Sequence, residues 1–329
     1  MTRVLILAPF SESQLSRLRA SMDVTHESWL ETRRLTDPDD LARRLKEEAI
    51  DILVVESDFV FEEVFEEAEA LRFVGICRAA TNHVEIDAAT LHGVVVVNTP
   101  ARNTQAVVEH VLGLMLSLAR GIPAAHRYVV EGRWESPVEP YISMRGSELA
   151  GKQLGIVGLG AIGKRVAEIG LALGMEVVAH DPYVEGGTRG VTMMALDDLV
   201  AGSDYVSIHV PSTAKTEGLL DGRRLSLMKP TAYLVNTSDA SVVEQGPLID
   251  ALQERRIEGA AFDVFESHPI TPQNPLLALD NVVLTPHLGG ATGETVERHS
   301  RMMTDDILRF LDGQRPKNLV NPEVWERSG

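Results

Sequence analysis

The chain has 329 residues, of which 44% are hydrophobic and 24% charged, so it is long enough for two globular domains and too apolar to be disordered throughout. Its formal net charge of -17 makes the phosphate backbones of nucleic acids poor partners. A single cysteine, Cys77, excludes an internal disulfide.

Cys77 ends an apolar run, which indicates a buried small side chain and not a nucleophile, and one unpaired cysteine suits a reducing compartment. The N-terminus enters a strand-like run at once, without the charged, apolar and cleavage regions of a secretory signal. The longest apolar stretch, residues 111–119, is too short to span a bilayer. We therefore expect a cytoplasmic protein without membrane contact.

Residues 1–98 alternate between apolar runs typical of buried strands and segments with apolar residues at helical spacing. Helices are predicted over residues 11–20 and after a start signal at Asp37 and Pro38. Buried strands separated by helices indicate a parallel sheet covered on both faces. The predicted strands are residues 4–8, 52–55, 73–76 and 94–97.

The segment Asn98-Thr99-Pro100 interrupts this pattern, and a long helix is predicted over residues 104–120. Residues 132–146 contain prolines and glycines and are predicted to be an irregular excursion over the surface. A second alternating series begins at Gln153, and a helix is predicted after Thr295. The strands of this series fit a doubly wound sheet. They are residues 153–157, 176–180, 205–210, 233–235, 260–264 and 282–284.

A segment Gly-Leu-Gly-Ala-Ile-Gly matches the G-x-G-x-x-G pattern of dinucleotide-binding proteins, between a predicted strand and a predicted helix. Gly158 allows the tight turn, Gly160 lets the backbone approach a pyrophosphate, and Gly163 lets helix and strand pack closely. Ala161 and Ile162 open the helix, whose free N–H groups attract the phosphate charge.

Asp181 lies at the end of the next predicted strand. An acid in this position accepts hydrogen bonds from the ribose hydroxyls of NAD and repels the 2′-phosphate of NADP. A glycine-rich turn without a ligand is the alternative, which the coincidence of strand, glycines, helix, second strand and acid disfavours. We therefore expect a Rossmann domain that binds NAD.

Seven further sequence blocks follow one another between Leu71 and the C-terminus. They are residues 98–100 with 107–110, 149–158, 209–213 with Thr216 and Gly218, 228–230 with 234–237, 262–265, 285–290 and 320–322. With these blocks in this order, the chain resembles the D-isomer-specific 2-hydroxyacid dehydrogenases, the family of phosphoglycerate, formate and D-lactate dehydrogenases.

The resemblance implies an α/β protein with two doubly wound parallel-sheet domains. Residues 1–98 and 291–329 would form a smaller, flavodoxin-like substrate domain, and residues 99–290 the Rossmann NAD-binding domain. The resemblance also implies a homodimer formed partly through the helix at 104–120, and hydride transfer between the nicotinamide and C2 of a 2-hydroxy or 2-keto acid. The further cofactor contacts that it implies are Pro211, Thr216, Asp263 and His287.

In that family an arginine grips the substrate carboxylate, and a histidine paired with a glutamate moves the proton. The histidine is present here as His287, but Asp239 stands where the arginine is expected and His268 where the glutamate is expected. All three follow predicted strands at the edge where open α/β sheets bind ligands, so we expect them to be the catalytic residues. Replacing the arginine removes an attraction of roughly 4 kcal/mol for a carboxylate about 4 Å away, at an effective dielectric near 20.

The family's glycine-rich substrate loop reads Ala80-Thr81-Asn82 in this chain. Its backbone N–H groups still suit an anion, although the glycines that ease such a loop are missing. Without the family arginine, a substrate carboxylate needs another cation. Arg78, at the start of the loop, is the first candidate and Arg102 the second, and a solvated surface arginine is the alternative for Arg78.

Three functions compete on this basis. We favour an NAD-dependent oxidoreductase that acts on a carbonyl or imine compound without a carboxylate beside Asp239, for which an amine in that place is one option, with His287 as the proton donor and His268 as its neighbour. The others are a different NAD-assisted reaction and a pseudoenzyme that senses NAD or binds a partner. Asp239, His268 and His287 would also suit zinc or iron, but we expect an acid–base cluster without a metal.

Overall fold

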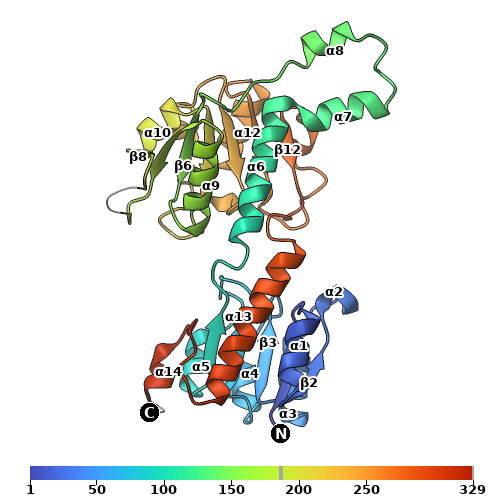
Figure 1. Ribbon diagram of the computed structural model, residues 1–329, viewed down its shortest axis with the longest axis vertical. Coiled ribbons are helices and arrows are strands. Elements are labelled where there is room, and N and C mark those ends of the chain that lie inside the picture. The colour runs from blue at the N-terminus through green and yellow to red at the C-terminus, as the bar shows by residue number, and fades with distance from the viewer. Residues whose placement is uncertain (185–187, 328–329) are drawn as a thin grey trace. The chain divides into compact units, whose positions relative to one another are not determined.

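The computed structural model describes residues 1–184 and 188–327, and the chain divides into two compact units. The N-terminal unit comprises Met1–Arg102 and Thr292–Gly329, and the central unit comprises Asn103–Ala291. The boundaries predicted from sequence, at 98/99 and 290/291, lie within a few residues of these. Each unit contains one parallel sheet, so the α/β class with two parallel-sheet domains is confirmed (Figure 1).

The N-terminal unit has a five-stranded sheet in the order β2-β1-β3-β4-β5, which is the flavodoxin-like order. Its strands are β1 (Arg3–Ile6), β2 (Asp23–His26), β3 (Ile52–Val55), β4 (Phe73–Ile76) and β5 (Val95–Asn98). Its helices are α1 (Glu12–Arg19), α2 (Trp29–Thr32), α3 (Pro38–Glu47), α4 (Glu62–Glu67), α5 (Ile86–Leu91), α13 (Gly293–Leu311) and α14 (Pro322–Arg327).

Alternate residues of these strands face two separate hydrophobic cores. Leu5 and Leu53 pack with α3 and α4 on one face, whereas Val4 and Ile52 pack with α1 and α13 on the other. Since both faces are buried, the strands are apolar throughout, which is why four of the five were predicted. β2 was missed because it is an edge strand whose residues are all at least partly exposed.

The central unit has a seven-stranded sheet in the order β12-β11-β10-β9-β6-β7-β8. Its strands are β6 (Gln153–Val157), β7 (Glu176–His180), β8 (Val191–Met193), β9 (Tyr205–Ile208), β10 (Tyr233–Asn236), β11 (Gly259–Phe262) and β12 (Val282–Leu284). The six predicted strands are present, and the edge strand β8 was missed because it is short and lacks buried residues. The order reverses beside β6, which places the glycine motif at the switch point of a doubly wound sheet.

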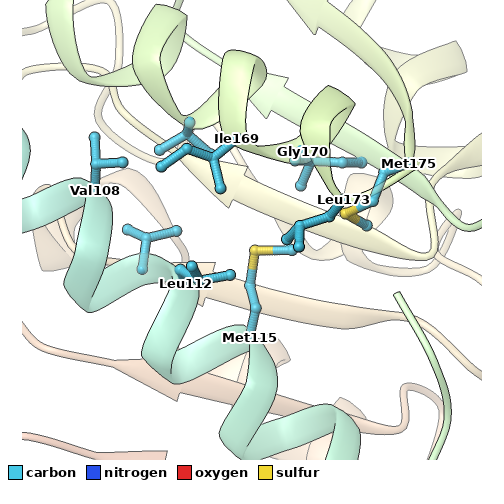
Figure 2. A pocket seen from close by; sticks show the side chains of 10 residues that line it. Val108, Leu112, Met115, Ile169, Gly170, Leu173 and Met175 are labelled. Atoms are coloured by element: carbon cyan, nitrogen blue, oxygen red, sulfur yellow. The ribbon is translucent and has the colours of Figure 1, made fainter. Parts of the chain in front are cut away.

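The helices of the central unit cover both faces of this sheet. They are α6 (Thr104–Arg120), α7 (Ile122–Val130), α8 (Val138–Ser143), α9 (Ala161–Ala172), α10 (Leu196–Gly202), α11 (Gly222–Leu225) and α12 (Gln245–Gln253), with short 3₁₀ turns η1 (Ala240–Val242) and η2 (Pro275–Ala278). Figure 2 shows α6 packed on α9 through side chains such as Val108, Met115 and Leu173. The cavity between them is about 10 Å³ and apolar, so it holds no ligand.

The excursion predicted over residues 132–146 contains a helix, and this part of the prediction was wrong. Pro137 precedes α8, where a proline is compatible with a helix start. Figure 1 shows α7 and α8 projecting from the sheet of the central unit as an arm, and neither helix has a buried residue. Among the described residues, no single helix is long and apolar enough to cross a membrane. The consecutive helices α6 and α7 together have the length and composition of a membrane span, but they are bent by 64° relative to each other.

Candidate active site

The glycine motif forms the turn between β6 and α9. Gly158 has a φ of +94°, and a Cβ there would lie 2.8 Å from the carbonyl oxygen of His209, so only glycine fits. A Cβ on Gly163 would lie 2.0 Å from the carbonyl oxygen of Gly158, so this residue allows the helix to pack on the turn. A Cβ on Gly160, in contrast, would meet no described atom within 4 Å. The turn therefore leaves open space at Gly160, as a dinucleotide pyrophosphate requires.

Asp181 is tied to this turn. Its Oδ2 accepts a hydrogen bond from the backbone N–H of Leu159 at 2.8 Å, and its Oδ1 accepts one from Tyr183 at 2.9 Å. Each carboxylate oxygen keeps a second lone pair, so two ribose hydroxyls can still donate to it. The residues of the turn therefore fit a dinucleotide.

Two other predicted cofactor residues bond within the protein. The hydroxyl of Thr216 donates to the carbonyl oxygen of Pro211 at 2.6 Å and accepts from the N–H of Thr213 at 2.9 Å. These bonds fold the loop after β9 into a compact turn. Thr216 therefore shapes the loop next to the glycine turn with its own hydroxyl.

Asp263, at the end of β11, is fully buried and holds the segment that carries His287. Its carboxylate accepts hydrogen bonds from the Thr285 hydroxyl at 2.6 Å, the N–H of Leu288 at 2.8 Å and the N–H of Gly289 at 2.7 Å. His110 Nε2 lies 3.0 Å from the Thr285 hydroxyl. The Asp263 carboxylate thus fixes the conformation of the segment that carries His287, a role that was not predicted from the sequence.

His110 lies on α6, within the sequence block of residues 107–110, and its contact with Asp263 was not predicted. Its Nε2 lies 3.3 Å from Asp263 Oδ1. A histidine on a helix face gave no local signal, because its partner is far away in the sequence.

The segment held by Asp263 places His287 in a left-handed turn, with a φ of +57°. Residues other than glycine rarely adopt this conformation, which costs roughly 1 kcal/mol or more. His287 Nδ1 lies 3.2 Å from His268 Nε2, and the two ring centroids are 5.1 Å apart. The structure thus brings together the two histidines that the sequence predicted, and both are exposed.

Asp239 lies between β10 and η1 and is half-buried. Its Oδ1 accepts from the N–H of Ser241 at 2.9 Å and from the Ser241 hydroxyl at 2.7 Å, so it caps the 3₁₀ turn. Asp239 and His268 line one open hollow of about 740 Å³, which we call the acidic hollow. Its charged or titratable lining residues are Glu217, Asp239, Glu244, Glu266 and His268.

No lysine or arginine is among the described residues that line the acidic hollow. Within the described part of the chain, no group of three or more histidine, cysteine, aspartate or glutamate side chains is arranged to hold a metal ion.

In the N-terminal unit, Arg78 bonds to its own loop. Its Nη2 donates to Asn82 Oδ1 at 2.7 Å and its Nε to the carbonyl oxygen of Ala80 at 3.3 Å. Arg78 is half-buried, and no carboxylate of the described residues lies within 4 Å of it. Across residues 1–184 and 188–327, no protein acceptor receives the backbone N–H groups of Ala80, Thr81 and Asn82.

Arg102 is committed elsewhere. Its guanidinium lies 2.5 Å from Glu56 and donates to His299 Nδ1 at 2.7 Å, in a largely buried cluster. Moving it toward a substrate would leave the Glu56 carboxylate buried without its partner, which is strongly unfavourable. Of the two replacement cations considered from sequence, Arg78 is therefore the available one.

Comparison with known proteins identifies the family. The sequence profile of the D-isomer specific 2-hydroxyacid dehydrogenase, NAD binding domain, matches residues 112–289. The chain belongs to this family. It is 40% identical to a glyoxylate reductase of Korarchaeum cryptofilum over 271 residues, which cover 82% of this chain and 81% of the relative.

Two solved structures are also similar to this chain. The TT0316 protein from Thermus thermophilus has a TM-score of 0.86 and 33% identity, and the alignment covers 97% of this chain and 100% of that one. An acyclic imino acid reductase, solved with NADPH and D-Arg, has a TM-score of 0.83 and 26% identity, with coverage of 97% and 100%. The chain is thus an oxidoreductase of the 2-hydroxyacid dehydrogenase type with an NAD(P) cofactor.

Proposed function

We propose that this family member transfers a hydride between NAD(H) and a carbonyl or imine carbon of a substrate that carries a positive charge beside Asp239. The observation behind the proposal is the acidic hollow lined by Asp239 and His268, the two residues that the sequence motifs align with the family's arginine and glutamate. The cofactor supplies or accepts the hydride, and the residues of this chain bind the substrate and move the proton.

The charge of the hollow favours a cationic substrate group. A carboxylate about 4 Å from Asp239 would meet a repulsion of roughly 4 kcal/mol at an effective dielectric near 20, and an ammonium or guanidinium group an attraction of similar size. Glu217 and Glu266 add negative charge to the same lining. The related imino acid reductase, solved with D-Arg, supports a substrate of this charge.

His287 and His268 would carry the proton as a pair. When the pair holds one proton beyond neutrality, His287 Nδ1–H donates to His268 Nε2, and His287 Nε2–H would be the donor to the substrate. In the reducing direction the substrate carbon gains the hydride, and its oxygen or nitrogen takes the Nε2 proton. Both rings are then neutral and the hydrogen bond between them is kept, so the pair replaces the histidine–glutamate pair of the family.

The loop of the N-terminal unit that begins at Arg78 is suited to an anionic group. Arg78 offers a cation that is bonded to its own loop, and the backbone N–H groups of Ala80, Thr81 and Asn82 offer three donors that have no protein acceptor among the described residues. We propose that they bind an anionic group of the substrate, in the role that the substrate loop has in the family.

Cofactor choice would follow from Asp181, which favours NAD(H) because its charge repels a 2′-phosphate. Calorimetric titration of the protein with NADH and NADPH tests this assignment. Tighter binding of NADH supports it, and equal or tighter binding of NADPH removes it.

A substrate panel tests the reaction. Oxidation of NADH should be followed with keto and imino compounds that carry an amine or guanidine, in parallel with glyoxylate, pyruvate and hydroxypyruvate. The proposal expects turnover of a cationic compound and turnover slower by orders of magnitude with the simple 2-keto acids. Ordinary enzymatic rates with the simple acids would overturn it.

The replacement of two of three catalytic positions also favours a second candidate, an NAD-binding protein that senses the cofactor or binds a partner without dehydrogenase activity. A different NAD-assisted reaction would retain the cofactor, which absorbance of the purified protein in the NADH band would reveal. Cofactor binding without turnover of any panel compound favours the sensor.

We also propose a homodimer formed through α6 and the arm. The arm exposes Val130, Trp134, Tyr141 and Ile142, each more than half accessible, which is unusual for a surface that meets only water. Light scattering after size exclusion tests the dimer, and Tyr141→Ser with Ile142→Ser should weaken it.

The cytoplasmic location stays a prediction, consistent with the buried thiol of Cys77, whose pKa is raised by burial.

A further inference from the structure

Lys215 and Tyr183 meet beside the carboxylate that is proposed to choose the cofactor. Lys215 Nζ donates to the Tyr183 hydroxyl at 3.3 Å and lies 5.8 Å from the centre of the tyrosine ring. Tyr183 is 76% exposed, so this contact is not a by-product of core packing. The tyrosine ring and hydroxyl thus hold an ammonium group at the surface.

The two side chains reach this place from opposite sides of the glycine turn. Tyr183 follows β7 and Lys215 lies in the loop after β9, and the sheet order β9-β6-β7 places these strands on either side of β6. The strands are parallel, so their carboxyl ends share the edge at which the turn begins. The N–H of Tyr183 donates to Asp181 Oδ1, so the residue that holds Lys215 is tied to the acid itself.

Lys215 has no anionic partner within the described residues. Lys46 and Lys229 lie within 4 Å of carboxylates, whereas Lys215, like Lys152, Lys164 and Lys317, has no described carboxylate within that distance, and it is the tyrosine contact that sets Lys215 apart. The loop that carries it is rigid for its length, since Thr216 bonds to Pro211 and Thr213. A cation held by an aromatic ring, with no carboxylate of residues 1–184 and 188–327 within 4 Å, is suited to an anionic ligand.

We infer that Lys215 is a second determinant of cofactor choice, which would bind the 2′-phosphate of NADP(H) and is overruled in the native protein by Asp181. This inference rests on the assignment of Asp181 to the adenosine ribose in the proposed function. The site carries one charge that rejects the phosphate and one that accepts it. Neutralising the acid is then sufficient to admit NADP(H), because the cation is already present.

Calorimetric titrations of five proteins with NADH and NADPH test the inference. They are the native chain, Lys215→Met, Asp181→Asn, Asp181→Asn with Lys215→Met, and Asp181→Asn with Lys46→Met as the matched lysine control in the N-terminal unit. Asparagine removes the charge and keeps one acceptor oxygen, which can receive the N–H of Leu159 or of Tyr183 but not both in the native geometry.

Asp181→Asn should tighten NADPH binding by about tenfold or more. Adding Lys215→Met to this variant should weaken its NADPH binding again by about tenfold, as expected for the loss of one charge-assisted hydrogen bond. The NADH affinity should change far less on adding Lys215→Met, and Lys46→Met should change neither. Raising the salt concentration should weaken NADPH binding more in Asp181→Asn than in its Lys215→Met derivative.

The inference fails if Lys215→Met changes the two cofactors equally or changes neither. If the native chain binds NADPH as tightly as NADH, Asp181 does not reject the 2′-phosphate, and the statement that it overrules Lys215 fails with it, while the binding role of Lys215 is still open to test. Lys215→Met in the native chain should then still weaken NADPH selectively, and the inference fails if it does not. A native protein that binds neither cofactor would overturn both proposals.

Discussion

His287 Nδ1 lies 3.2 Å from Nε2 of His268, so the two imidazoles form one hydrogen-bonded unit in which one ring donates and the other accepts. A second added proton would remove the acceptor and place two positive rings in contact, where they repel. The geometry of the pair therefore disfavours two charged rings at once. A carboxylate in place of His268 would instead attract the charged form of His287.

The first prediction concerns the partner of His287. His268→Gln keeps an amide that can bond to Nδ1, whereas His268→Leu leaves this atom without that partner. We expect turnover of the identified substrate to be about tenfold higher in the glutamine variant than in the leucine variant, as for loss of one hydrogen bond of about 1.4 kcal/mol. Equal rates in the two variants would mean that His268 does not act through His287.

The second prediction restores the family pattern. Asp239→Arg with His268→Glu should raise the reduction of glyoxylate or hydroxypyruvate by at least about tenfold over the native chain, because it returns the carboxylate clamp and the charge partner of His287. Asp239→Arg alone should help less, since His287 would face a new cation without a carboxylate. The two effects should therefore be non-additive.

Steady-state kinetics of the native, single and double variants check this expectation. Asp250→Arg, an exposed change of the same charge on α12, serves as the control and should leave the rate unaltered. Full family activity is not expected, because Ala80-Thr81-Asn82 also replaces the glycine loop. An unchanged rate in the double variant would contradict the place we give to Asp239.

The third prediction separates two glycines of the turn. Gly160→Ala should fold normally, because a Cβ there meets no described atom within 4 Å, but it should weaken NADH binding by about tenfold or more, since the methyl takes the space of the pyrophosphate. Gly158→Ala should lower stability by about 1 kcal/mol or more, because its φ is +94° and its Cβ would press on His209. Thermal unfolding and NADH titration distinguish the two, and normal NADH affinity of Gly160→Ala would refute the first.

The fourth prediction is a pH dependence of stability in the N-terminal unit. His299 is fully buried, accepts from Arg102 at Nδ1, and must therefore donate through Nε2 to the carbonyl oxygen of Pro9 at 2.6 Å. Burial, with the nearby Arg102 charge, lowers the pKa of His299 from 6.5 to about 4. Its unfolded form thus takes up the proton first as the pH falls.

Stability from this lowered pKa is complete above pH 6.5 and is lost as the pH falls through about 4, by about 3 kcal/mol in all. His299→Gln should flatten this part of the profile, whereas His92→Gln, at an exposed position, should not. Urea unfolding at a series of pH values measures both. Some acid loss should remain in the first variant, because burial also lowers the pKa of His209 to about 4.

The family, the dinucleotide-binding turn and most strands of both sheets can be predicted from the sequence without the structure. Fully buried parallel strands such as β3 and β6 are apolar along their whole length, so a local pattern reveals them. The glycine pattern of the turn is also visible locally, because the positive φ of Gly158 and the contact of Gly163 with Gly158 lie within the motif, although the approach of His209 to Gly158 comes from the fold. The exposed edge strands β2 and β8 have no such pattern and were found only in the structure.

The tertiary structure alone decided which side chains act on one another. The sequence predicted His268 and His287 as site residues, but their hydrogen bond joins positions nineteen residues apart and required the folded loops. The commitment of Arg102 to Glu56 and His299, and the contact of Lys215 with Tyr183, likewise join segments that no local pattern connects. Hydrogen bonds and ion pairs act over a few ångströms, so their partners are fixed by how the strands and helices are assembled and not by spacing along the chain.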